Sequence, residues 1–220
     1  MTRIAIIENG PSLCSFFGRA LDRAEVEHFT FRAWRGASFP EEFDACILTG
    51  DFHNITDGLK DYHRREIEFL ERLDGRKAFA SCFAHQLVAV AHGGTIVHRE
   101  TRLLGWERVH PEGENLLDFA PDYDAVCLNI EAVEQPPTDA RVLASSQGCH
   151  YQLLSYGDNI LTSQGHPEMA VRNGQWRVSA LALTIAGGPT AEWRGFRGSR
   201  PKRLPTESPF MGAVVSWLCA

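Results

Sequence analysis

The most informative run of this sequence is Lys77-Ala78-Phe79-Ala80-Ser81-Cys82-Phe83-Ala84-His85-Gln86. Lys77 to Ser81 is typical of a short apolar strand, and Ala84 to His92 is predicted to form a buried helix that ends at Gly93-Gly94. A strand that passes directly into a helix is typical of a parallel α/β sheet. The run therefore predicts that class of fold and places Cys82 on the turn between strand and helix.

The residues before this run repeat the alternation of strands and helices. Thr2 to Glu8 is expected to be a buried strand, ended by the turn Asn9-Gly10-Pro11, after which Ser12 is expected to cap a helix through Ala20. Apolar residues at helical spacing predict another helix between Asp57 and Leu73. The other strands expected in this half are Val26–Phe31 and Ala45–Thr49, the second of which is stopped by Gly50-Asp51.

After Gly94 the sequence predicts shorter strands and an antiparallel arrangement. A hairpin around Gly157-Asp158 is expected to join Tyr151–Leu154 to Asn159–Gln164, and Met211–Leu218 is expected to be a closing helix. The other short strands expected here are Thr95–Val97, Trp106–His110 and Ala125–Leu128. We predict one α/β domain over residues 1–220, with a flavodoxin-like open, mostly parallel sheet flanked by helices and antiparallel strands added in the second half.

Composition limits the classes of function. The 220 residues carry a formal net charge of −6 and a pI near 5.8, which argues against nucleic acid as the default partner. We expect no signal peptide and no membrane span. The six cysteines lie far apart, which suits unpaired thiols in a reducing compartment and predicts a cytoplasmic protein. They are Cys14, Cys46, Cys82, Cys127, Cys149 and Cys219.

Three residues directly follow predicted strands, where ligands bind in open parallel sheets: Gly50, Cys82 and His166. Cys82 has small residues two positions before and after it, which is the steric demand of a nucleophile elbow. The positive end of the following helix dipole would favour its thiolate. The alternative is a buried core thiol without a chemical role.

His166-Pro167-Glu168 makes the chemical interpretation stronger. Pro167 biases His166 towards an extended conformation, in which residues two apart project to the same side, so Glu168 can reach His166. A carboxylate that orients an imidazole beside a thiol is the arrangement of covalent acyl transfer. The alternative for this tripeptide is a capped turn before a helix.

These residues carry a family resemblance. Cys82-Phe83-Ala84-His85-Gln86 resembles the C-x-G-H-Q elbow of class I glutamine amidotransferases, and Gln164-Gly165-His166-Pro167-Glu168 resembles their Q-x-H-P-E segment. The resemblance extends from Ile4 to Glu168 and is closest to stand-alone relatives of the amidotransferase domain of GMP synthase.

The resemblance implies a role for each matching residue. Cys82 would be the nucleophile, His166 the general acid and base, and Glu168 the carboxylate that orients it. The backbone N–H groups of Gly50 and Phe83 would form the oxyanion hole. Substrate-binding residues would be Gln86, which supports and lines the glutamine pocket in that family, and Asn129.

Two departures bear on the substrate. Ala84 replaces the usual glycine of the elbow, and Leu128-Asn129-Ile130-Glu131 stands where relatives of GMP synthase have S-H-x-D. That segment lies near the α-amino and α-carboxyl groups of glutamine in the family. Because Leu128 and Ile130 offer no polar side chain, the resemblance predicts weak turnover of free glutamine unless a partner protein completes the pocket.

The leading functional hypothesis is a glutaminase that releases ammonia for an acceptor on a synthetase or ligase partner. The alternatives are a γ-glutamyl hydrolase or transpeptidase acting on a small γ-glutamyl metabolite, and a non-catalytic regulatory subunit. No cofactor is expected, and the spacing of His85, His92 and His98 does not predict a metal site. The basic segment Arg194–Arg203 is expected to be a solvated loop, with docking of an anionic substrate or a synthetase as the alternative.

Overall fold

The computed structural model describes residues 2–10, 14–36, 38–112, 117, 119, 121–173 and 175–220, without the side chain of Cys14. Within these residues, nine strands form one sheet in the order β2-β1-β3-β4-β9-β8-β7-β5-β6. The first five strands in this order are parallel, and the remaining neighbours are antiparallel. The mostly parallel, flavodoxin-like first half and the antiparallel second half are as predicted.

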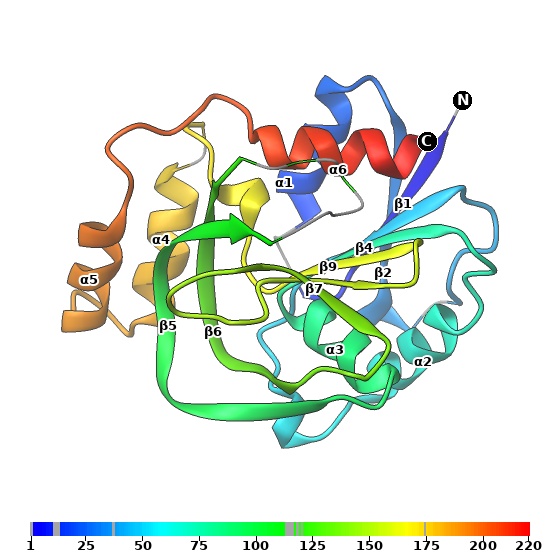
Figure 1. The fold of residues 1–220 in the computed structure, drawn as a ribbon, viewed down its shortest axis with the longest axis horizontal. Coiled ribbons are helices and arrows are strands. Elements are labelled where there is room, and N and C mark those ends of the chain that lie inside the picture. The colour runs from blue at the N-terminus through cyan, green and yellow to red at the C-terminus, as the bar shows by residue number, and fades with distance from the viewer. Residues whose placement is uncertain are drawn as a thin grey trace.

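The parallel part of the sheet is covered by two helices on each face (Figure 1). Its strands are β1 (Arg3–Glu8), β2 (Glu27–Arg32), β3 (Ala45–Leu48), β4 (Lys77–Ser81) and β9 (Ile160–Ser163). Its helices are α1 (Cys14–Arg23), α2 (Asp61–Leu70), α3 (Phe83–Ala91) and α6 (Pro209–Cys219). Because side chains alternate along a strand, Ile4 and Ile6 pack towards α1 and α6, whereas Ala5 and Ile7 pack towards α2 and α3.

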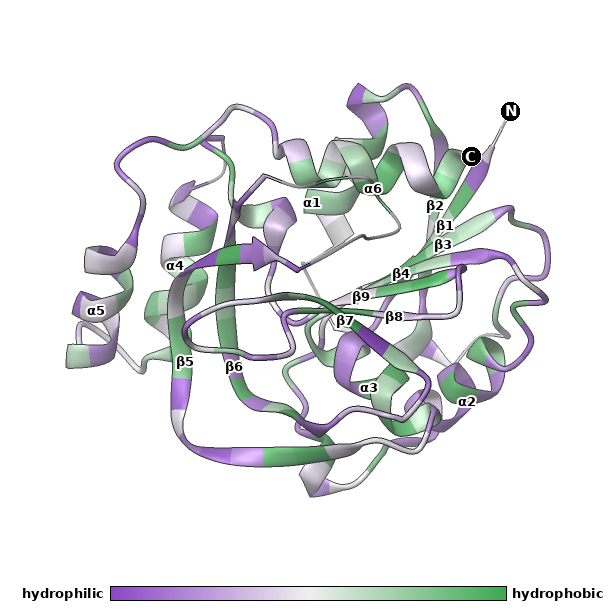
Figure 2. Ribbon diagram, viewed as in Figure 1, coloured by the Kyte–Doolittle hydropathy of each residue, from purple (hydrophilic) through white to green (hydrophobic). Residues whose placement is uncertain are grey.

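Burial on both faces explains why the inner strands β1, β3 and β4 are apolar rather than alternating, whereas β2 at the edge of the sheet is more polar and more exposed. Figure 2 shows hydrophobic residues along the central strands. The apolar side chains of β1, β3 and β4 are almost fully excluded from solvent. The turn that carries Cys82 directly follows the carboxyl end of β4, one of these buried strands.

The antiparallel part consists of β5 (Thr95–Pro111), β6 (Tyr123–Gln135), β7 (Ala140–Ser145) and β8 (Leu153–Tyr156). The long pair β5 and β6 forms a curved ribbon at one side of the molecule, and α4 (Gln175–Ile185) and α5 (Ala191–Ser199) pack against it (Figure 1). Phe196 of α5 is 1% exposed and lies with Trp106 of β5 in one apolar cluster. The ribbon and the end of α4 line one side of the candidate site.

Several predicted elements need correction. Thr95–Val97 and Trp106–His110 are not separate strands, because both belong to the 17-residue β5. The predicted loop Arg194–Arg203 is wrong in its first part, because residues 194–199 belong to the helix α5. This helix buries Phe196 against Trp106 and Trp193. This helix is stabilised by tertiary packing, and its Gly195 and Gly198 weaken the helical signal in the sequence.

Other elements agree with the sequence or fall outside the described residues. The hairpin at Gly157 is present, with β8 and β9 paired antiparallel and Gly157 at a φ of 58°. β7 and α4 had no predicted counterpart. Pro11 and Ser12, expected to form the first turn and cap, lie outside the described residues.

The sequence also predicted unpaired cysteines and no membrane span. Cys46, Cys82, Cys127, Cys149 and Cys219 are free thiols, as expected for these five positions. Across the described ranges, the helices are too short or too polar to traverse a lipid bilayer.

Candidate active site

Cys82 lies on a strained turn between β4 and α3. Its φ of 57° and ψ of −111° are unusual for any residue other than glycine. Its N–H donates to the carbonyl oxygen of Ser163 over 2.8 Å, which fixes the turn against the end of β9. Cys82 is 8% exposed, so the thiol is largely enclosed yet reaches the surface of the adjoining cleft. The geometry is that of the predicted nucleophile elbow.

His166 follows β9 and is fixed by a bridge to β6. Its N–H donates to the carbonyl oxygen of Val126 over 2.8 Å. The neighbouring Gly165 leaves no room for a side chain, since a Cβ there would lie 2.8 Å from the Cβ of Ala125. The close approach of the two segments therefore depends on glycine and sets the position of the imidazole.

Glu168 pairs with His166 as the sequence predicts. Oε1 of Glu168 lies 2.7 Å from Nδ1 of His166, and both side chains are buried. The contact arises where the chain passes from His166 into the short 3-10 helix η3 (Pro167–Met169). Because Nδ1 faces the carboxylate, Nε2 is the ring nitrogen available to Cys82.

The charges around His166 favour its protonated form. Burial alone lowers the pKa of His166, but the carboxylate of Glu168 and the sulfur of Cys82 outweigh burial and raise this pKa to about 10. Both influences require that Glu168 and Cys82 lie close to the ring. The three residues are thus close enough to act on one another.

The two backbone groups expected to form the oxyanion hole lie at the same edge of the sheet. β3 and β4 are parallel neighbours in which Leu48 pairs with Ala80, and the residues two positions further along are Gly50 and Cys82. Phe83 is the first residue of α3, and N–H groups in the first turn of a helix have no partner within the helix.

A cleft of about 430 Å³ opens beside Cys82. Both residues predicted to bind substrate line it. Gln86 donates from Nε2 to the carbonyl oxygen of Glu131 over 2.8 Å, and Asn129 donates to the same oxygen over 2.7 Å. Within the described residues, Oδ1 of Asn129 has no hydrogen-bond partner, but this atom is buried. Leu128 and Ile130 lie in the same wall.

Sequence reasoning missed the role of Glu131. Its buried carboxylate accepts the N–H groups of Ile55 and Thr56 over 2.6 and 3.0 Å and so holds the short helix η2 (Ile55–Asp57) at the cleft. The only signal in the sequence is that Glu131 stands at the acidic position of the S-H-x-D segment. Its acceptor atoms are already used within the protein.

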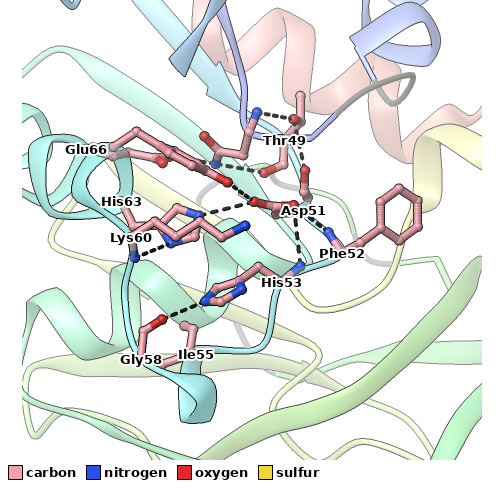
Figure 3. Close-up of polar contacts among 12 residues, drawn as sticks. Thr49, Asp51, Phe52, His53, Ile55, Gly58, Lys60, His63 and Glu66 are labelled. Carbon is pink, nitrogen blue, oxygen red and sulfur yellow. Dashed lines mark hydrogen bonds and ion pairs between the residues drawn. The ribbon is translucent and has the colours of Figure 1, made fainter. Parts of the chain in front are cut away.

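A second missed group surrounds Asp51, the residue after Gly50. His63 of α2 contacts its carboxylate (Figure 3). Tyr62 of the same helix also contacts this carboxylate. Adjacency to Gly50 was the available signal, but nothing in the sequence indicates which helix residues Asp51 meets.

The histidines considered above as metal ligands are His85, His92 and His98. In the part of the chain that the structure describes, no three histidine, cysteine or acidic side chains are grouped so as to hold a metal ion. His85 is buried, with Nδ1 2.7 Å from Oγ1 of Thr162, and burial lowers the pKa of His85 to about 3. It is therefore neutral and part of the packing between α3 and β9.

The fold resembles that of one class of protein. The fold is that of class I glutamine amidotransferases, and a glutamine amidotransferase from Thermotoga maritima superposes with a TM-score of 0.76 over 99% of this chain and 96% of its own, at 15% identity. No protein-family model matches the chain.

Relatives by sequence are named enzymes of the same type. The chain is 28% identical to gamma-glutamyl peptidase 4 of Arabidopsis thaliana over 174 residues, which cover 72% of this chain and 67% of that protein. It is 28% identical to a glutamine-hydrolyzing GMP synthase subunit of Sulfolobus acidocaldarius over 59% of this chain and 69% of that one. The chain spans between 54 and 67% of the length of the four Arabidopsis peptidases it matches. These relatives are consistent with a member of the class I glutamine amidotransferase family.

Proposed function

We propose that this protein hydrolyses γ-glutamyl amide bonds, using Cys82 as nucleophile, His166 as general acid and base, and Glu168 as the orienting carboxylate. The observation that carries the proposal is the strained elbow of Cys82 beside the buried pair of His166 and Glu168, at the edge of an open cleft. A core thiol without chemical function has no need of a left-handed backbone conformation or of a charged partner.

In the proposed reaction, the thiolate of Cys82 attacks the side-chain carbonyl carbon of the γ-glutamyl group. The N–H groups of Gly50 and Phe83 donate to the oxyanion that forms on that carbonyl. His166 passes a proton from Nε2 to the departing nitrogen, so that ammonia or an amine leaves and a γ-glutamyl thioester remains. His166 then takes a proton from water, which attacks the thioester, so that glutamate leaves and the thiolate of Cys82 is restored beside protonated His166.

Glutamine is the simplest substrate for this chemistry, and its hydrolysis would release ammonia. The similarity to the glutamine-hydrolyzing subunits of GMP synthase supports this substrate and a synthetase partner that uses the ammonia. Asn129 lines the cleft, and its buried Oδ1 would accept from the substrate α-ammonium group only if the side chain turned towards the cleft.

A γ-glutamyl peptide is the second candidate, and two observations favour it. Four of the relatives are named gamma-glutamyl peptidases. The cleft also extends past the apolar side chains of Leu128 and Ile130 to Arg102. Nη1 of Arg102 already contacts the carbonyl oxygen of Ile185 and the carboxylate of Glu192, so a peptide leaving group would pair its carboxylate with the other N–H groups of this guanidinium.

The thioester itself provides the test of the reaction. Intact-mass spectrometry after rapid mixing with glutamine or a γ-glutamyl dipeptide should detect one added γ-glutamyl group, which is absent in Cys82→Ser. Cys149→Ser is the matched control, because burial raises the pKa of that thiol to about 11 and leaves it unreactive. Persistence of turnover in Cys82→Ser would contradict the mechanism.

The ratio of kcat/KM for glutamine to that for a panel of γ-glutamyl dipeptides separates the two substrates. Each should be measured with the purified chain alone. A preference for dipeptides supports the peptidase activity, whereas efficient turnover of free glutamine supports the glutaminase and shows that the apolar side chains of Leu128 and Ile130 do not impair its binding.

A further inference from the structure

The carboxylate of Asp51 is saturated by hydrogen bonds from its surroundings. Oδ1 accepts the N–H groups of Phe52 and His53 over 2.6 and 3.3 Å, and Oδ2 lies 2.6 Å from the hydroxyl of Tyr62 and 3.1 Å from Nε2 of His63 (Figure 3). A carboxylate has about four acceptor positions. Although Asp51 borders the cleft, it has no free position with which to bind a substrate, so its role lies within the protein.

The hydrogen bonds of His63 define its protonation state. Nδ1 accepts the N–H of Lys60 over 3.2 Å, and a backbone N–H can only donate, so Nδ1 carries no proton. The neutral ring therefore bears its proton on Nε2 and donates it to Asp51. Burial lowers the pKa of His63, which matches this assignment. Burial opposes ionisation of Asp51, but the hydrogen bonds from His63 and Tyr62 outweigh it and lower the pKa of that carboxyl.

His63 also touches the second expected oxyanion donor. Its ring lies 4.5 Å from the ring of Phe83, measured between centroids, in a tilted arrangement. One buried side chain of α2 therefore contacts Asp51, next to Gly50, and Phe83 at the start of α3. Movement of His63 would disturb both segments.

The residue on the other side of Gly50 is held as well. The N–H of Asn9 donates to Oγ1 of Thr49 over 3.1 Å, and Nδ2 of Asn9 donates to the carbonyl oxygen of Thr49 over 3.1 Å. The same Nδ2 donates to Oε1 of Glu66 over 2.8 Å. Glu66 lies on the same helix as Tyr62 and His63, so α2 holds Gly50 through both neighbours.

We propose that Asp51, Tyr62 and His63 are positioning residues that fix the N–H groups of Gly50 and Phe83 relative to each other. This inference rests on the proposed function, because it assigns a task to these residues only if an oxyanion forms at Cys82. Displacement of a reacting or stabilising group by 1 Å can cost about 100-fold in rate. The network acts on the transition state and not on the reactivity of the thiol, since its contacts do not include His166 or Glu168.

Two reactions of Cys82 distinguish this role from a general effect on folding. Hydrolysis of γ-glutamyl p-nitroanilide passes through an oxyanion, whereas alkylation by iodoacetamide displaces iodide from carbon without forming one. Tyr62→Phe should lower kcat for hydrolysis about tenfold and Asp51→Asn about 100-fold, with KM changed less than about twofold, because the loss is confined to the transition state. The rate constant for alkylation of Cys82 should stay within about twofold of that of the parent protein.

The variants differ in how they disturb the network. Tyr62→Phe removes one hydroxyl from a half-buried side chain. Asp51→Asn removes the charge and brings an NH2 group against groups that now donate to the carboxylate. Tyr156→Phe is the matched control, because Tyr156 lies where β8 pairs with the beginning of β9, away from the end that contacts Cys82.

The outcomes separate the proposals. Unchanged kcat in both variants, or a parallel loss of hydrolysis and alkylation, would overturn the positioning role while leaving the proposed function intact. Absence of hydrolysis by the parent protein with glutamine, γ-glutamyl dipeptides and the anilide would overturn the proposed function and this inference with it.

Discussion

Replacing Glu168 by glutamine tests the proposed roles in the candidate triad most directly. The change keeps the size of the side chain and allows an acceptor oxygen at Nδ1 of His166, but it removes the negative charge 2.7 Å from the ring. Both side chains are buried, so solvent does little to screen this charge. The loss should therefore destabilise the imidazolium that faces Cys82.

The structure sets the scale of the expected effect. Burial lowers the pKa of His166, and Glu168 is the largest of the influences that raise it to about 10, compared with an ordinary value of 6.5. One pKa unit corresponds to about 1.4 kcal/mol, so if about half of that rise depends on Glu168, its charge contributes about 2–3 kcal/mol, or roughly 60-fold in the stability of the imidazolium. We expect kcat to fall by about this factor in Glu168→Gln, and further in His166→Ala, which removes the base itself.

The pH dependence gives an independent readout. A raised pKa means that His166 keeps its proton to high pH, so removal of the negative charge should move the high-pH limb of the kcat/KM profile to lower pH. The profile should be measured with γ-glutamyl p-nitroanilide for both variants and for Glu107→Gln, a glutamate that also accepts a hydrogen bond but lies on β5. An unshifted limb, or a larger loss in Glu168→Gln than in His166→Ala, would refute the assigned roles.

Three further substitutions test the packing around the site. Burial raises the pKa of Glu66 to about 8 from 4.5, so the folded protein should lose stability as pH rises from 4.5 to 8. Glu66→Gln should therefore raise Tm more at pH 8 than at pH 5. An equal gain in Tm at both pH values would count against a protonated Glu66. Gly165→Ala should lower kcat at least about tenfold by displacing His166. The control is Gly195→Ala, where a Cβ meets no atom within 4 Å, and it should be neutral or stabilise the protein by up to about 1 kcal/mol. Equal kinetics in the two variants would show that Gly165 is not required. Phe196→Ala should lower the free energy of unfolding in urea by about 3–5 kcal/mol, and a loss under about 1 kcal/mol would contradict the packing of α5 on the ribbon.

The sequence was sufficient for features that depend on neighbouring residues. The apolar run before Cys82, its small neighbours and the helix after it predict the elbow, because a tight turn restricts the residues that adjoin it. The contact of His166 with Glu168 was also predicted, since the two are only two positions apart and Pro167 restricts the backbone between them. The assignment of catalytic roles remains the proposal that these contacts support.

Contacts between distant parts of the chain required the tertiary structure. The long strand β5 is stabilised by its pairing with β6, and α5 by the burial of Phe196 against Trp106, so neither has a sufficient local signal. In the same way, the acidic side chain of Glu131 meets Ile55 and Thr56 across 76 and 75 positions of sequence.

The surroundings of Gly50 show the same division. The sequence places Gly50 after a predicted strand, where a ligand can bind, because the end of a parallel strand is defined by its own residues and the turn that follows. It does not indicate that Tyr62 and His63 would meet Asp51, or that His63 would also reach Phe83, because these contacts depend on how α2 packs beside α3 on the sheet. Local sequence therefore identified the candidate reactive residues, and the packing of the helices determined which side chains lie around them.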